Sequence, residues 1–323
     1  MRQPDSQVKA TAAGNPPLRL GLFSTQGALL VIQTATLLAM AATVATKVWQ
    51  DHAWFGFLLV GLAALAWSPE VRFRRERMWW FAFVAGIFAY TLLRSLADET
   101  GIPVRTSYPI QFDRALFFGT DPIQWLQDRF FQVSDVGALD VFSVGMHWSF
   151  FVAPYAMAVV VFFRKREAFP RYVGIVVGTM YLGLLLFFLV PTAPPWLAAQ
   201  QGHLDGVYRV MDFVGGSVDK DTYRSFYASL AEPNSVAAMP SIHEGVTFAM
   251  YLWARENARR FAPFLLVYAI VMGLSLMYLG EHYLLDLIAG VACASAAWIL
   301  CRRFISQPVS ATQLAGRDSS PRS

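Results

Sequence analysis

His282 and Asp286 stand four residues apart in the segment Tyr-Leu-Gly-Glu-His-Tyr-Leu-Leu-Asp, where a long apolar run resumes after a short break. On a helix this spacing places both side chains on one face, where the carboxylate can fix the imidazole tautomer and stabilise its charged form. A second histidine, His243, begins another apolar run. Ionisable side chains in membrane segments are costly and usually serve a function. These three residues therefore predict a catalytic site that uses histidine chemistry.

The composition indicates a membrane protein. Of the 323 residues, 56% are apolar and only 15% are charged, whereas soluble domains are about a quarter charged. We expect an all-α polytopic bundle of about eight transmembrane spans, near residues 24–47, 53–68, 78–97, 141–163, 171–190, 241–255, 261–280 and 284–301. The basic residues lie between these spans, so the isoelectric point of 9.1 does not indicate nucleic-acid binding. Cys293 and Cys301 fall in the last span and are interpreted as small apolar side chains.

The connections between the predicted spans differ in charge. The short connections at 69–77, 164–171 and 255–260 are rich in arginine, whereas 98–140 holds three Arg and seven acidic residues and 192–240 holds three basic and five acidic residues. Basic loops mark the cytoplasmic side. The pattern predicts a multi-pass cell-membrane protein with both termini in the cytoplasm and the histidines near the outer face. Both histidines then lie at helix N-termini, which favour a phosphate anion.

The predicted organisation has a catalytic core and additional segments. Residues 1–20 and 304–323 are expected to be disordered cytoplasmic tails, and 21–77 to hold two extra spans. Residues 78–303 are expected to form a six-helix catalytic core with outer loops 98–140 and 192–240. In the first loop, aromatic and charged residues alternate over 110–132, which suits an interfacial or re-entrant helix. The second begins with the stiff turn Pro191–Trp196 and is predicted to cap the site.

Two of these motifs carry a family resemblance. Pro240-Ser241-Ile242-His243 resembles Pro-Ser-Gly-His, the second signature of the type-2 phosphatidic acid phosphatase superfamily, with Ile in place of Gly. Ser275-Leu276, followed after five residues by His282 and then by Asp286, is similar to the third signature, Ser-Arg-x5-His-x3-Asp, with Leu276 in place of Arg. The first signature, Lys-x6-Arg-Pro, is absent.

Other segments resemble the inositol phosphorylceramide synthase branch of that superfamily and its bacterial members. These segments are Val190–Trp196, Tyr208–Asp212, Phe112–Phe117 and Met146–Trp148 with the following Pro154. The resemblance covers about residues 78–300. It implies a fold similar to the six-helix catalytic core of the superfamily.

The resemblance also implies roles for individual residues. His282 would be the nucleophile on phosphorus, Asp286 its orienting partner, and His243 the acid that protonates the leaving oxygen. The intermediate would be a phosphohistidine, formed without a metal or another cofactor. Ser241 belongs to the second signature and is a candidate phosphate-binding residue. Because the first signature is missing, Arg209, Arg114 or Arg224 from the outer loops could bind the phosphate in its place.

Several candidates keep a structural alternative. His147 either faces the site from the fourth span or caps a neighbouring helix. Arg94, near the outer end of the third span, either binds phosphate or extends to the membrane surface. Asp113 and Arg114 could pair with each other. A metal held by the histidines with Glu281 or Glu244 is disfavoured, because adjacent residues point to different helix faces.

Three functions compete at this stage. The first is a phosphotransferase that moves a phospho-headgroup, such as inositol phosphate, onto a lipid hydroxyl. The second is a phosphatase acting on phosphatidic acid or a polyprenyl phosphate or diphosphate. The third, a transporter, is disfavoured because the histidines lie at the membrane edge, whereas transporter sites lie near the midplane. The expected partners are lipid substrates and the bilayer, with no nucleic acid and no obligate protein partner.

Overall fold

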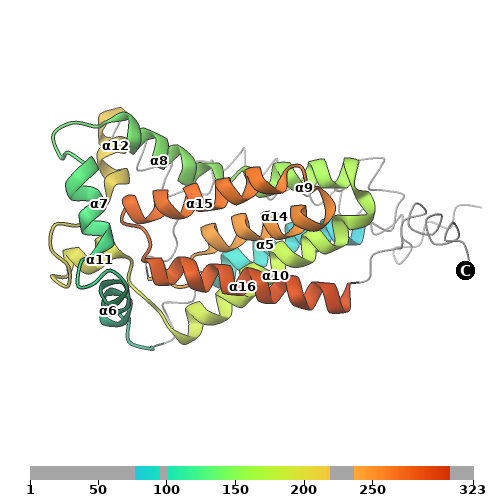
Figure 1. Ribbon diagram of the computed structural model, residues 1–323. Coiled ribbons are helices and arrows are strands. Elements are labelled where there is room, and N and C mark those ends of the chain that lie inside the picture. The colour runs from blue at the N-terminus through green and yellow to red at the C-terminus, as the bar shows by residue number, and fades with distance from the viewer. Residues whose placement is uncertain (1–76, 95–100, 219–235, 306–323) are drawn as a thin grey trace, which may run out of the picture.

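The computed structural model describes residues 77–94, 101–218 and 236–305, and within them every regular element is a helix. Long helices form a bundle, and short helices gather at one of its ends, at the left in Figure 1. The predicted spans 24–47 and 53–68, the tail 1–20 and nearly all of the tail 304–323 lie outside the described residues.

Three helices form the centre of the bundle, and each of them packs against the other two: α10 (Phe169–Leu189), α14 (Ile242–Asn257) and α16 (Leu284–Phe304). Around them lie α5 (Arg77–Arg94), α8 (Ala138–Ser149), α9 (Ala153–Arg164) and α15 (Ala262–Tyr278), with a single 3-10 turn at Arg166–Ala168. The short helices at the end are α6 (Ser107–Leu116), α7 (Pro122–Phe130), α11 (Pro195–Gln200) and α12 (Val210–Val218). These short helices come from the two predicted outer loops.

The bundle has the properties of a membrane domain. The helical segment Arg166–Leu189 and helix α16 are each long and apolar enough to cross a membrane, and α8 with α9 adds a third candidate if the bent pair is one span. Helix α15 and Met78–Thr91 of α5 are apolar but shorter. Large apolar side chains such as Leu185, Val267 and Ile299 are more than half exposed, which is typical of a lipid-facing surface. The count of eight spans stays a prediction.

Two predicted segments differ from the structure. The span expected at 141–163 is broken into α8 and α9, which are bent by 48°. Pro154 lies in the first turn of α9, where it lacks an N–H and cannot extend a helix that continues from α8. The single interfacial helix expected within 110–132 is instead two helices, α6 and α7, which are separated by a turn at Gly119 with φ of 91°.

Helices α14 and α16 touch backbone to backbone near the end where the short helices lie. A Cβ atom on Gly245 would lie 2.9 Å from the carbonyl oxygen of Gly290, and one on Gly290 would overlap the carbonyl oxygen of Ser241. The N–H of Ser241 donates to the carbonyl of Asp286 at 2.9 Å. Small residues allow this close approach in membrane helices. The contact fixes the N-terminal ends of α14 and α16 relative to each other.

Candidate active site

The predicted pair of His282 and Asp286 is formed. His282 lies in the turn before α16 and Asp286 in the first turn of that helix, and Nδ1 of His282 is 3.4 Å from Oδ2 of Asp286. The same carboxylate oxygen accepts a hydrogen bond from the N–H of Tyr283 at 2.9 Å. Asp286 is fully buried and His282 nearly so. Because Nδ1 faces the carboxylate, Nε2 is the ring nitrogen available for chemistry.

Two further histidines lie beside this pair. The ring centre of His243, in the first turn of α14, is 5.8 Å from that of His282 and 4.6 Å from that of His147. His147 comes from the last turn of α8 and is 1% exposed. Phe150, in the break between α8 and α9, packs edge-on against His243 at 4.4 Å. His147, His243 and His282 therefore form one histidine cluster, and the ring of His147 lies against that of His243. A role for His147 in the site stays a prediction.

Two arginines, Arg94 and Arg209, lie within electrostatic range of the histidine cluster. The charge of Arg94, at the end of α5, acts on His147 and His243, and the charge of Arg209 acts on His147. Nε of Arg209 lies 2.8 Å from Oε1 of Glu281, the residue before His282. The guanidinium also lies 4.3 Å from the ring centre of Trp196. A guanidinium held by a carboxylate and an aromatic face is pre-organised to bind phosphate oxygens.

The loop that carries Arg209 is locked onto the turn between α15 and α16. Gln127, buried on α7, donates from Nε2 to the carbonyls of Tyr208 at 2.9 Å and Tyr278 at 2.8 Å, and its Oε1 accepts from the N–H of Tyr208 at 2.8 Å. Gly280 has φ of 74°, and a Cβ there would lie 2.6 Å from the carbonyl oxygen of Tyr208. Only glycine combines this backbone conformation with so close a contact. A single glutamine in a polar stretch gave no sequence signal for this role.

Asp113 supports the site from α6, which the sequence did not predict. Its Oδ2 accepts from the N–H of Leu284 at 2.9 Å and its Oδ1 from the N–H of Leu285 at 3.2 Å, so it caps the N-terminus of α16. Burial raises the pKa of the Asp113 carboxyl to about 6, and the two backbone donors oppose that shift. The alternative pairing of Asp113 with Arg114 is wrong: Arg114 is 44% exposed and lies 3.9 Å from Asp121. The sequence feature that could have indicated this role is an acidic residue on the face of α6 that is otherwise apolar and buried.

The remaining candidates lie as follows. Ser241 is fully buried, and its Oγ accepts from the N–H of Glu244 at 3.3 Å, so the hydroxyl caps α14. Phosphate binding by Ser241 or Arg114 stays a prediction, and Arg224 lies outside the described residues. Among the residues that the structure describes, no group of three or more His, Cys, Asp or Glu side chains is arranged to hold a metal ion. Glu281, one of the two glutamates named in the metal alternative, forms an ion pair with Arg209.

Residues 110–300 match the PAP2 superfamily, and because this match covers more than half of the sequence, the chain belongs to that superfamily. Over 183 residues it is 24% identical to the phosphoinositol dihydroceramide synthase of Bacteroides thetaiotaomicron, an alignment that covers 53% of this chain and 58% of that protein. It is 31% identical over 150 residues to the inositol phosphorylceramide synthase of Candida albicans, covering 45% of this chain and 31% of that protein.

A third relative is the inositol phosphorylceramide synthase catalytic subunit of Saccharomyces cerevisiae, which is 28% identical over 145 residues, covering 43% of this chain and 36% of that subunit. The chain thus spans between 31% and 58% of the length of these three curated relatives. No solved structure matches the chain significantly. The comparisons confirm the predicted superfamily and the predicted branch.

Proposed function

We propose that this protein is an integral membrane phosphotransferase that moves a phospho-headgroup from a phospholipid to a lipid hydroxyl through a phosphohistidine on His282. The observation that carries the proposal is the pairing of His282 with Asp286 at 3.4 Å, with the ring of His243 5.8 Å away. The names of the relatives refer to phosphoinositol and phosphorylceramide. We therefore infer that the transferred headgroup is inositol phosphate and that the acceptor is the hydroxyl of a ceramide-like lipid.

In the first step Nε2 of His282 attacks the phosphorus of the donor lipid. A nitrogen–phosphorus bond forms while the bond from phosphorus to the lipid oxygen breaks, and the leaving oxygen takes a proton from His243. The ring of His282 becomes cationic in the intermediate, and the buried carboxylate of Asp286 beside Nδ1 stabilises that charge. His147, which packs against His243, is proposed to hold the ring of His243 in position.

In the second step the acceptor hydroxyl gives its proton to His243 and attacks phosphorus. The new oxygen–phosphorus bond forms as the nitrogen–phosphorus bond breaks, which restores His282 and the protonated His243. Arg209 and Arg94 are proposed to bind the non-bridging oxygens, in place of the missing first signature. Their charges act on the histidine cluster, where a guanidinium stabilises the negative charge on the transferring group.

A transferase must keep water away from the intermediate until the acceptor arrives. Helices α6, α7, α11 and α12 are proposed to form a cover over the histidine cluster. Two contacts support this proposal: Asp113 of α6 caps α16, and Trp196 of α11 donates its backbone N–H to the carbonyl of Gly280 at 3.0 Å. A more open site would favour hydrolysis, which is the activity of the alternative phosphatase.

The comparison of transfer with hydrolysis is a direct test. Purified protein in nanodiscs would be incubated with headgroup-labelled phosphatidylinositol, with and without a ceramide. We expect a new labelled lipid that depends on the acceptor, and little water-soluble product in its absence. His282→Ala should abolish the new lipid while the protein stays monodisperse. Release of soluble inositol phosphate at the same rate with and without acceptor would replace the transferase with a hydrolase.

The proposed topology has eight spans, with both termini in the cytoplasm, two extra spans at 21–77 before a six-helix core, and the active site at the outer face. The charge asymmetry of the connections supports it. His203 and Glu167 are both exposed and lie in connections at opposite ends of the bundle, and the native cysteines of the described residues are buried. A cysteine at 203 should react with an impermeant thiol reagent on intact cells, and one at 167 only after permeabilisation. The reverse pattern would invert the topology.

A further inference from the structure

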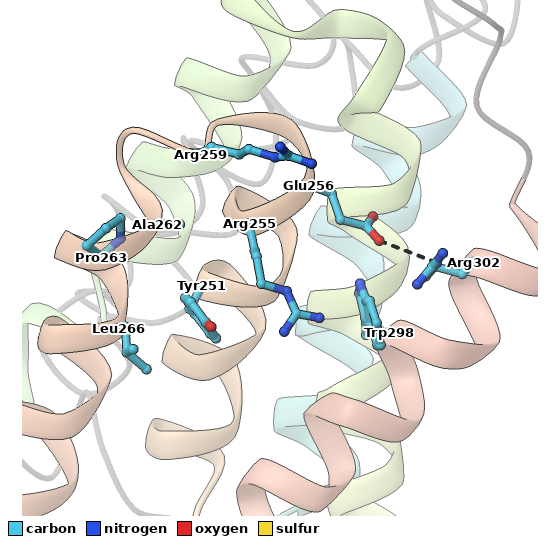
Figure 2. A pocket seen from close by; sticks show the side chains of 9 residues that line it. All are labelled: Tyr251, Arg255, Glu256, Arg259, Ala262, Pro263, Leu266, Trp298 and Arg302. Atoms are coloured by element: carbon cyan, nitrogen blue, oxygen red, sulfur yellow. Dashed lines mark ion pairs between the residues drawn. The ribbon is translucent and has the colours of Figure 1, made fainter.

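A cavity with a basic lining lies at the end of the bundle opposite the histidine cluster. It has a volume of about 580 Å³ and is formed by the C-terminal turns of α14 and α16 and the first turn of α15 (Figure 2). Helix α14 carries His243 in its first turn and Arg255 twelve residues later. At a rise of about 1.5 Å per residue the two lie about 18 Å apart along the helix. The cavity is therefore separate from the proposed active site.

The cavity has an excess of positive charge. Arg255, Arg259 and Arg302 line it, with Glu256 as its one carboxylate. The two oxygens of Glu256 are engaged by Arg302 and by Arg171, each at 3.3 Å. Among the described residues, no carboxylate pairs with Arg255 or Arg259. Basic residues at the C-terminal ends of α14 and α16 complement the negative ends of the helix dipoles. That effect does not explain why these arginines converge on an open cavity.

Aromatic and apolar side chains complete the walls. The guanidiniums of Arg255 and Arg302 lie 5.1 Å and 4.9 Å from the ring centre of Trp298, and Figure 2 shows them on either side of it. This contact holds both guanidiniums in place near the cavity. Leu266 of α15 lines the same cavity, next to exposed apolar residues such as Val267 on the outer surface of the bundle. A ligand seated here would meet cations at one end and a lipid-facing surface at the other.

We propose that this cavity binds the phosphate group of an anionic phospholipid from the leaflet on its side of the membrane. Phosphate is the anion that arginine forks bind best, and basic pockets between membrane helices bind anionic headgroups. The volume is within the range of small-ligand sites, about 300–1,000 Å³. The apolar wall favours a lipid over free phosphate as the source of that group. In the proposed topology this leaflet is the cytoplasmic one, but the inference needs neither that topology nor the proposed activity.

The test compares two double variants with the same change in charge. Arg255→Gln with Arg259→Gln removes the two cavity arginines that pair with no carboxylate of the described residues. Arg260→Gln with Arg303→Gln removes two neighbouring arginines that do not line it. Each full-length protein would be placed in phosphatidylcholine nanodiscs containing spin-labelled phosphatidylglycerol, and the motionally restricted lipid fraction would be measured. Near a membrane surface each arginine contributes about 1 kcal/mol to binding an anionic lipid, so the first variant should bind about 30-fold more weakly.

Leu266→Trp provides a second variant that fills the cavity and keeps its charge. We expect wild type and the control pair to retain phosphatidylglycerol, and both cavity variants to lose it. Equal retention by all four proteins would overturn the proposal. Thermal stabilisation by inorganic phosphate in pure phosphatidylcholine, dependent on Arg255 and Arg259 and without lipid retention, would also overturn it and assign the cavity to a soluble anion. If the first variant is unstable, the Leu266→Trp result decides between these outcomes.

Discussion

Replacing Asp286 with asparagine should slow the reaction by between about 10³-fold and 10⁴-fold and leave substrate binding nearly unchanged. Asp286 is fully buried, with Oδ2 3.4 Å from Nδ1 of His282. At an effective dielectric constant of about 20, that distance corresponds to about 5 kcal/mol between unit charges. Each 1.36 kcal/mol is about tenfold in rate. The cost falls on kcat because the cationic ring of His282 exists only once the phosphohistidine begins to form.

Asparagine is a suitable replacement because the side-chain oxygen that accepts from the N–H of Tyr283 at 2.9 Å is retained. The start of α16 is thereby preserved while the charge is lost. Asp113→Asn is the matched control, since Asp113 caps the same helix end through Leu284 and Leu285. Steady-state transfer in nanodiscs would give kcat and KM for each protein. A loss of less than about tenfold for Asp286→Asn, or an equal loss for both variants, would show that Asp286 acts only as a helix cap.

Three other predictions follow from the contacts around the site. Arg209→Lys should lower kcat/KM by about 10-fold to 100-fold in the transfer assay. A charge-assisted contact contributes about 1.5–3 kcal/mol, and a lysine cannot keep the fork geometry of the guanidinium. An unchanged kcat/KM would show that Arg209 does not bind the phosphate. Gln127→Ala should lower the free energy of unfolding by about 2–4 kcal/mol, because it removes a buried hydrogen bond to the carbonyl of Tyr278 and two part-buried hydrogen bonds to the backbone of Tyr208. Equal unfolding temperatures in detergent would contradict this. Activity should persist in EDTA, because the proposed mechanism uses His282 and His243 and needs no ion; complete loss with rescue by one divalent metal would refute that mechanism.

The sequence predicts best those parts of the site that depend on local spacing. The pair of His282 and Asp286 is encoded within five residues, and a helix start brings the two side chains together whatever the rest of the chain does. His243 was recognisable because a polar residue in an apolar run is unusual. The centre of the bundle was predictable for the same reason, since long apolar runs must form helices in a membrane.

The contacts between distant segments were not predictable in this way. Asp113 lies 171 residues before Leu284, to which it is hydrogen-bonded, and no local pattern links the two. Gln127 joins α7 to a loop and to α15 through backbone groups, which carry no residue-specific signal. The break before Pro154 was visible as a proline, but a proline can either kink or end a helix. Only the packing of Phe150 against His243 shows what the break contributes to the site.

The contact between Gly245 and Gly290 limits how the two helices can move when the proposed substrates bind. Where two helices meet through side chains, a change of rotamer lets them separate or slide. Here main-chain atoms meet main-chain atoms, so no rotamer can relax the interface. His243 and Asp286 therefore move together as parts of one rigid unit. In the proposed mechanism, lipids with different chains or headgroups would be accommodated by the surrounding short helices, which would separate specificity from catalysis along the chain. Acceptor preference could then change by substitutions in α6, α7, α11 and α12 without disturbing the chemistry.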